Sequence, residues 1–195
     1  MLARSGVALA LAVVLSGCVP GTYFDPNDPY ATGLRLFDSG EPANAIQYWK
    51  PLAEEGDCDA QYRYVTLFYL GEGVPRDYDS AREWWAKAAH QGQYRAQMIL
   101  GTVYGRMSLT TGGFPRSLTV DCRGGCGVPR DPQQAYEWLR LAHASLPPEA
   151  EAARQQVSLE ITALQAELTP DQRADAERHI SAWTPSQNRC VPRDL

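Results

Sequence analysis

The sequence predicts an all-α protein, an α/α superhelical solenoid of about four helix-turn-helix pairs. Three observations support this fold class: apolar residues recur with a period of 36 residues, their spacing within each copy is helical, and one turn sequence occurs twice. At 195 residues the chain is long enough to bury a core within one domain.

The repeat is clearest in two segments that each place five side chains on one helical face. Their spacing is i, i+3, i+4, i+7 and i+8, which puts the five on the same side of a helix. Each position advances by 36 between the two segments, which comprise Ala45, Tyr48, Trp49, Leu52, Ala53 and Ala81, Trp84, Trp85, Ala88, Ala89. A third copy, Ala135 to His143, follows after 54 residues, which indicates an insertion of about 18 residues at about 108–126.

The turns between the helices carry their own signals. Gly73 to Asp77 has the sequence Gly-Val-Pro-Arg-Asp, which recurs as Gly127 to Asp131. We expect Asp77 and Asp131 to cap the following helices, because an aspartate carboxylate accepts the free amide hydrogens of a first turn. Pro132 suits the first helical position, where a missing amide hydrogen costs nothing.

The amino-terminal segment has the features of an export signal. Arg4 precedes the apolar run Val7 to Leu15, which is too short to span a bilayer. Leu15-Ser16-Gly17-Cys18 then resembles the lipobox of bacterial lipoproteins. This resemblance implies that residues 1–17 are a signal peptide and that Cys18 is lipidated; an ordinary secretory signal with a chance cysteine is the alternative. Residues 18–30, rich in proline and turn formers, are predicted to be a lipidated tether.

The repeat pattern, with alanine, a glycine pair, aspartate and tryptophan at fixed spacing, resembles the Sel-one-like repeat of the tetratricopeptide superfamily. The resemblance covers roughly residues 31–147, and Val65 departs from it where the next copy has Gly101. It implies a concave face lined by the first helix of each pair, on which a protein partner binds. Residues 148–183 are predicted to be a degenerate capping pair that buries Ala174, Ile180 and Trp183, and 184–195 a surface tail.

Partner-contacting residues are predicted from their place in the first helices and in the insertion. Polar residues that alternate with apolar positions are candidates for the concave face, and the turn-rich insertion is a candidate for recognition. The alternative is that the insertion has no role in binding and is only tolerated by the fold. The candidates are Gln61, Arg63, Gln93, Arg95, Gln97, Phe114 and Arg116.

Four cysteines follow Cys18, an even number that fits an oxidising compartment: Cys58, Cys122, Cys126 and Cys190. Three pairings are possible. Cys122 and Cys126 could close a small loop within the insertion, which would leave Cys58 for Cys190. A zinc site is the competing interpretation, but a lone Cys-x-x-x-Cys lacks two further ligands at usable spacing.

Composition and motifs favour binding over catalysis. A net charge of -5 argues against a nucleic-acid footprint. Hydrolase, phosphate-loop and metalloprotease motifs are absent from the sequence, so we expect no catalytic residues, no cofactor and no metal. The sequence therefore predicts a protein-binding scaffold anchored to the periplasmic side of the outer membrane. The alternatives are a cysteine-rich penicillin-binding or hydrolase-like repeat protein and a periplasmic regulator of a sensor.

Overall fold

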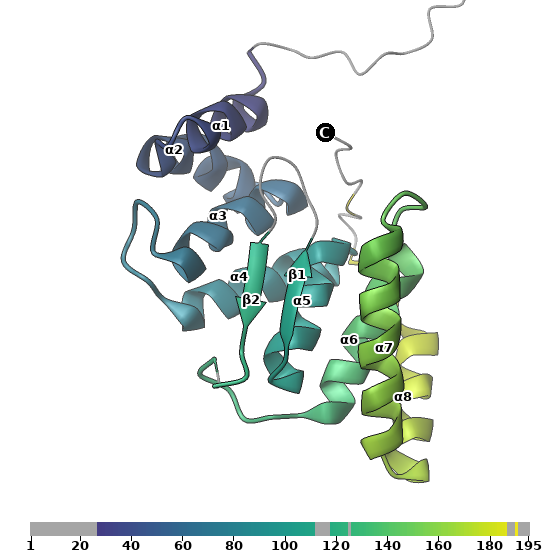
Figure 1. Ribbon diagram of the computed structural model, residues 1–195. Helices are drawn as coiled ribbons and strands as arrows, with labels where there is room; N and C mark the ends of the chain where they lie inside the picture. The colour runs from purple at the N-terminus through teal and green to yellow at the C-terminus, as the bar shows by residue number, and fades with distance from the viewer. Residues whose placement is uncertain (1–26, 112–117, 125, 187–189, 191–195) are drawn as a thin grey trace, which may run out of the picture.

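A computed structural model of the chain describes residues 27–111, 118–124, 126–186 and 190 (Figure 1). The predicted signal peptide and Cys18 lie outside these residues. The described part contains eight helices and one two-stranded sheet. The elements are α1 (Pro29–Asp38), α2 (Pro42–Glu54), α3 (Cys58–Leu70), α4 (Tyr78–His90), α5 (Tyr94–Gly105), β1 (Ser108–Thr111), β2 (Leu118–Asp121), α6 (Pro132–Ser145), α7 (Glu151–Glu167) and α8 (Pro170–Ala182).

The helices stack in chain order as a solenoid. Each helix from α1 to α6 packs against the next, and α6 contacts both α7 and α8. This arrangement gives three consecutive packed pairs, α1–α2, α3–α4 and α5–α6, followed by α7 and α8, and it confirms the all-α solenoid.

The repeated apolar positions form the core. Trp49 and Trp85 are 1% and 2% exposed, and the alanines of the three copies are almost completely buried. Small alanines let neighbouring helices approach closely. The two tryptophans pack against the first helix of their own pair, Trp49 against Tyr30 and Phe37 and Trp85 against Tyr69. Tyr48 is an exception to the predicted face, because its side chain is 38% exposed at the edge of the stripe.

Two glycines mark the closest helix contacts. A Cβ atom at Gly33 would lie 2.3 Å from Nε1 of Trp49, and one at Gly101 would lie 2.5 Å from the Leu139 side chain. At each of these glycines, the first helix of a unit thus leaves room for a side chain of the second helix. Val65, which departs from the repeat pattern, is fully buried in the same core cluster as Ala81 and Trp85.

The helix caps predicted from the turns are confirmed. Asp77 Oδ1 accepts hydrogen bonds from the amides of Asp79 and Ser80, and Asp131 Oδ1 accepts one from Gln134. Thr169 and Gln172 form a reciprocal capping box at the start of α8.

The first helix begins earlier than the predicted tether allows. Asp28 Oδ1 accepts the amide hydrogen of Tyr30 at 3.0 Å, and Pro29 occupies the first turn of α1. Residues 29 and 30 therefore belong to the helix, so the tether boundary at residue 30 was wrong. The Asp-Pro pair that suggested a linker is the same cap that starts α6 at Asp131 and Pro132.

The insertion contains a hairpin that sequence reasoning did not predict. β1 and β2 pair antiparallel, with Leu109 opposite Val120 and Thr110 opposite Thr119. Leu109 and Val120 are buried, whereas Thr110 and Thr119 face solvent and their hydroxyls lie 2.9 Å apart. Figure 1 shows the hairpin over α5, against which both strands pack. Buried and exposed side chains alternate along both strands. Each strand is only four residues long and is flanked by turn residues, so this alternation is too short to predict a strand from the sequence.

The carboxyl-terminal pair has a sparse apolar core. α8 buries Ala176, whereas the predicted Ala174 is exposed and Ile180 and Trp183 are only partly buried. Beyond α8, the amides of Ser186 and Cys190 donate to the carbonyls of His90 and Gln91, so this part of the tail lies against the end of α4. None of the helices in the described residues combines the length and apolar character needed to cross a membrane.

Candidate protein-binding groove

Three of the predicted partner-contacting residues are buried inside the solenoid. Gln61 is 4% exposed, and Gln93 and Gln97 are 0% exposed. Their assignment to a partner-binding face was wrong. Alternation with apolar positions does not imply exposure here, because the first helix of a unit packs against helices on more than one side.

The buried glutamines join successive repeats. Gln61 Nε2 donates to the carbonyl of Ala53 at 3.0 Å, and Gln97 Nε2 donates to the carbonyl of Ala89 at 3.0 Å. Both donor and acceptor advance by 36 residues, so the bond is part of the repeat. Each bond adds a side-chain donor to a carbonyl in the last turn of the preceding helix, which also accepts the amide hydrogen of Gly56 or Gly92.

Gln93 has a different structural task from the other two. Its side-chain oxygen caps α5 by accepting the amide hydrogen of Ala96 at 2.9 Å, and its Nε2 donates to Asp59 at 3.1 Å. Gln91 Nε2 similarly donates to Gln61 Oε1 at 2.9 Å. These polar contacts bind the start of α3 to the turn between α4 and α5.

The two predicted arginines lie on the surface of the first helices and stack on neighbouring tyrosines. The Arg63 guanidinium carbon is 5.6 Å from the ring centre of Tyr62, and that of Arg95 is 4.7 Å from the ring centre of Tyr94. Both arginines are half-buried. The Arg63 Nε also donates a hydrogen bond to the Tyr30 hydroxyl at 3.3 Å, so this arginine joins α3 to α1.

Arg95 also lines a groove with a volume of about 730 Å³. Its base is formed by α5, one wall by Thr110 of β1, and the other by the α6–α7 connection and the first turns of α7. Tyr94 and Met98 supply buried apolar surface at the base. The lining residues are Tyr94, Arg95, Met98, Thr110, Pro147, Glu149, Ala150, Ala152, Ala153 and Gln156.

Sequence reasoning found Arg95 but missed the α7 wall. The sequence predicts Ala150, Ala152 and Ala153 only as part of the degenerate capping pair at 148–183. No local pattern marks them, since the groove depends on how α7 returns beside the insertion. Phe114 and Arg116, the candidates within the insertion, lie outside the described residues.

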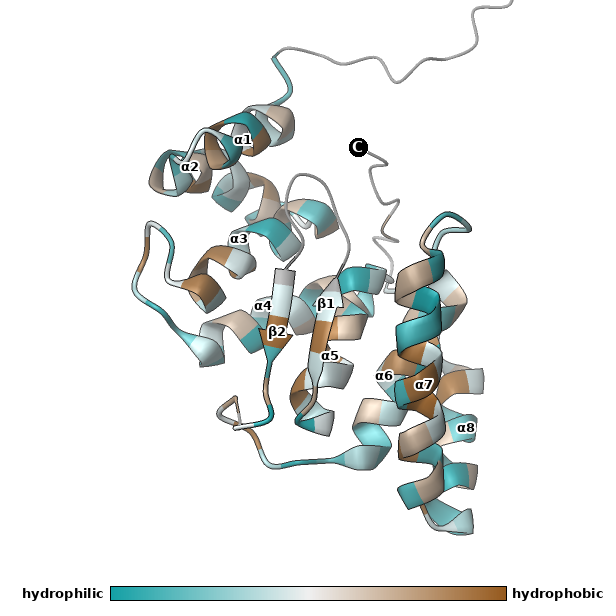
Figure 2. Cartoon of the chain, in the orientation of Figure 1, coloured by the Kyte–Doolittle hydropathy of each residue, from teal (hydrophilic) through white to brown (hydrophobic). Residues whose placement is uncertain are grey.

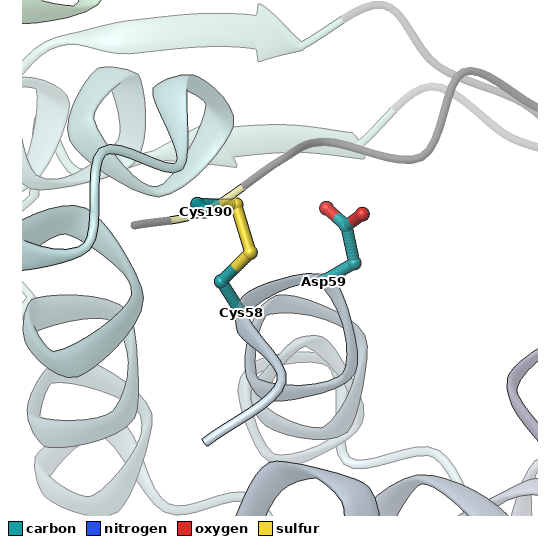
Figure 3. A group of neighbouring side chains, drawn as sticks. All are labelled: Cys58, Asp59 and Cys190. Atoms are coloured by element: carbon teal, nitrogen blue, oxygen red, sulfur yellow. A yellow bond between two sulfur atoms is a disulfide. The ribbon is translucent and has the colours of Figure 1, made fainter. Parts of the chain in front are cut away.

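The four cysteines form two disulfides, Cys58–Cys190 and Cys122–Cys126. The first joins the start of α3 to the tail over 132 residues, and the second closes a loop beside β2. Figure 3 shows Asp59 next to Cys58 and Cys190, and potential ligand atoms of the three lie within 4.8 Å of one another. This group is not a thiolate metal site, because both sulfurs are bonded to each other and Asp59 accepts a hydrogen bond from Gln93.

The three histidines lie apart, each in its own contact. His90 packs edge-on against Trp138, His143 Nε2 lies 3.1 Å from the Ser158 hydroxyl, and His179 Nδ1 lies 3.0 Å from Glu137. The groove is lined by none of them. Its lining is aromatic and aliphatic, with the polar side chains of Thr110 and Gln156, the guanidinium of Arg95 and the exposed carboxylate of Glu149.

Comparison with protein families finds the Sel1 repeat at residues 58–93 and 122–142. The first match covers α3 and α4, and the second covers the end of the insertion and most of α6. The chain is also 32% identical over 68 residues to the ERAD-associated E3 ubiquitin-protein ligase component HRD3A of Arabidopsis thaliana. The match includes 34% of this chain and 10% of HRD3A, so the chain spans about a tenth of that relative's length.

Two solved structures are similar to this chain. One is c5321, a protective antigen of uropathogenic Escherichia coli strains that displays an SLR fold, with a TM-score of 0.59 and 24% identity over 82% of this chain and 31% of that chain. The other is a Sel1 repeat protein from Oxalobacter formigenes, with a TM-score of 0.49 and 20% identity over 78% of this chain and 59% of that chain. The former supports the fold.

Proposed function

Since this chain is a Sel1-repeat protein of the tetratricopeptide-like superfamily, we propose that it is a scaffold that binds another protein through the groove between α5, β1 and α7. The groove is the observation that carries this proposal. It combines buried apolar surface at Tyr94 and Met98 with a half-buried guanidinium at Arg95, a mixture typical of protein-binding sites.

A binding role without catalysis fits the distribution of reactive side chains. Across the described residues the histidines are scattered in separate contacts, and the four cysteines are joined in disulfides. The cysteine pairs do not follow the 36-residue period, which separates this chain from repeat proteins with a cysteine pair in each unit. These features support a scaffold over the penicillin-binding or hydrolase-like alternative.

The proposal includes export and attachment to the outer membrane by a lipid on Cys18, facing the periplasm. Its support is the short apolar run followed by Leu15-Ser16-Gly17-Cys18. Two disulfides in the folded part add support, since such bonds persist in oxidising compartments. A partner in an envelope assembly follows from this location.

Fractionation tests the anchor. Wild-type protein should sediment with membranes, and Cys18→Ser should be released into the soluble fraction. Cys122→Ser combined with Cys126→Ser is the control, because it removes other cysteines and opens only a short loop. Continued membrane attachment of Cys18→Ser would contradict lipidation.

Affinity purification of the full chain from detergent-solubilised envelope tests the scaffold. We expect one protein in stoichiometric amount that is lost with Arg95→Glu and retained with Arg82→Glu, a matched reversal on α4. Recovery of a glycan or antibiotic without a protein would contradict the scaffold.

A further inference from the structure

The solvent-facing side of α7 lacks the charges that an exposed helix surface normally carries. Between the first and last residues of the helix, Glu151 and Glu167, every exposed position is uncharged. These positions share one side of the helix and are called the α7 face: Ala152, Gln155, Leu159, Thr162, Ala163 and Ala166. Leu159, at the middle of the face, is 72% exposed, which is the highest value for a large apolar side chain in the described part of the chain.

The polar groups on the α7 face already have partners within the helix. The Thr162 hydroxyl donates to the carbonyl of Ser158 at 2.9 Å, and Gln155 Nε2 donates to Glu151 Oε1 at 2.9 Å. The buried side of α7 packs on α6, and Figure 1 shows α7 in front of α6. The α7 face is therefore an uncharged surface on the side of the helix away from the core.

The neighbouring helix α8 has the more usual surface for the end of a repeat array. It exposes Asp171, Arg178 and His179 to solvent. A terminal unit normally presents such a polar outer face, because no further repeat covers it. An uncharged face with a large aliphatic side chain at its centre instead indicates an interaction surface.

The α7 face is arranged so that it fits a second copy of itself. Leu159 is the middle residue of the helix, which runs from Glu151 to Glu167. Antiparallel overlap of two copies centred on Leu159 places Ala152 opposite Ala166 of the second copy, because each lies seven residues from the centre. The alanines let the two helices approach closely, while the two leucines meet at the two-fold axis.

The absence of charge is what contact between identical faces requires. A charged side chain close to a two-fold axis would lie beside the same charge on the second copy, so such residues oppose self-association. The glutamates at the two ends of α7 are each paired within their own chain, Glu167 with Arg130 at 2.7 Å and Glu151 with Arg154 at 4.0 Å. Repulsion between the ends of the two helices is therefore reduced.

We propose that the α7 face is a self-association surface, through which two copies of this chain pair antiparallel about a two-fold axis at Leu159. The contact is one helix wide and smaller than the ~1,200 Å² of stable interfaces, so the dimer is weak and reversible. Ala152 belongs to both the α7 face and the lining of the groove, so the second copy lies beside the groove. This inference goes beyond the proposed scaffold function and does not depend on it.

Cysteine crosslinking of the full chain, purified in detergent, tests both the pairing and its direction. On oxidation, Leu159→Cys should form a covalent dimer with itself. Ala152→Cys and Ala166→Cys should each form at least fivefold less dimer alone, because antiparallel pairing places identical positions ~20 Å apart. An equal mixture of these two variants should restore the yield. Wild type and Ala174→Cys, at an exposed position on α8, give the background in non-reducing gels.

A charge on the two-fold axis provides a second test without an added cysteine. Leu159→Glu should lower the fraction of dimer at least fivefold at equal protein concentration, measured by analytical ultracentrifugation of the full chain. Ala174→Glu adds the same charge to the exposed side of α8 and should leave the dimer fraction unchanged. Because Leu159 is exposed, the thermal midpoint of Leu159→Glu should equal that of wild type, which verifies that the variant folds.

Several outcomes would overturn this inference. They are equal dimer yields from Leu159→Cys and Ala174→Cys, a dimer fraction unchanged by Leu159→Glu, and self-crosslinking of Ala152→Cys as strong as that of Leu159→Cys. In isolated envelopes, crosslinking of Leu159→Cys only to a different protein would assign the α7 face to that protein instead. The purified assays contain no other protein, so their failure leaves the scaffold proposal intact, and the dimer stands if affinity purification captures no partner.

Discussion

The inner repeats and the carboxyl-terminal pair are held together by different forces. α5 buries ten of its 12 residues, whereas α8 buries one of its 13. Figure 2 shows teal and pale colours along much of α8. An inner helix has neighbours on both sides, but a terminal pair has one neighbour and must present a polar face to water.

Charged and polar contacts supplement the sparse core of the terminal pair. Glu177 on α8 accepts a hydrogen bond from the Tyr136 hydroxyl at 2.6 Å and pairs with Arg140, both on α6. Arg130 donates to both carboxylate oxygens of Glu167 at the end of α7, at 2.9 and 2.7 Å. We therefore expect attachment of the terminal pair to depend more on ionic strength than the stability of the inner repeats does.

The Cys58–Cys190 disulfide connects these two regions, and its loss should have the largest effect. Cys58→Ser combined with Cys190→Ser releases a loop of 132 residues, for which chain entropy gives about 5 kcal/mol of lost unfolding free energy. The double variant Cys122→Ser and Cys126→Ser opens a short loop and should lose about 2 kcal/mol. Urea denaturation measures both losses. Equal losses would contradict the entropic account of the long bridge.

Trp85→Ala should destabilise the inner repeats by about 3 to 5 kcal/mol, because it removes a fully buried aromatic side chain and leaves a cavity. Trp183→Ala, at a partly buried position after α8, should lose less. Chemical denaturation followed by circular dichroism checks the difference. A larger loss at Trp183 would reverse the assigned roles of the two regions.

Glu177→Gln should lower the unfolding free energy by about 1 kcal/mol, since its ion pair with Arg140 is partly exposed. Molar salt should reduce the difference between wild type and variant. Glu83→Gln, at an exposed position on α4, is the control and should change neither quantity. An undiminished Glu177→Gln effect in high salt would show that attachment of α8 does not depend on screened charge.

A smaller effect is expected from His143, which lies between α6 and α7. Partial burial, together with the positive charges of Arg154 and Arg140, lowers its pKa below the usual 6.5. The unfolded chain therefore binds this proton more tightly, and stability present above pH 6.5 should decline as pH falls toward the lowered pKa. His143→Gln should flatten this dependence in thermal melts between pH 8 and 5. An unchanged profile would assign the pH effect to other groups.

The sequence predicts the repeated features of the fold well, because each feature occurs more than once. The stripe around Trp49 and Trp85 and the caps at Asp77 and Asp131 follow from local chemistry at fixed spacing. Non-repeated features were harder to predict. Short strands in a turn-rich insertion have no local signal beyond two buried residues, Leu109 and Val120, and burial of Ala176 rather than Ala174 depends on how α8 is rotated against α6.

The candidate site was predicted only in part for a related reason. Gln61, Gln93 and Gln97 are polar and are expected on the surface, but each is buried and donates a hydrogen bond to a neighbouring repeat. Such a bond joins two helices, so the residue periodicity within one helix does not predict it. Arg95 was found because it lies on the first helix itself, whereas the walls of its groove come from the insertion and α7.

Site-specific photocrosslinking in cells tests the central claim most directly. A photoreactive amino acid replaces Gln156, which lines the groove, or Glu83, which is exposed on α4. The scaffold account predicts one defined protein adduct from position 156, its loss when Arg95→Glu is added, and none from position 83. An adduct of equal yield from both positions, or one from position 156 that survives Arg95→Glu, would contradict binding through this groove.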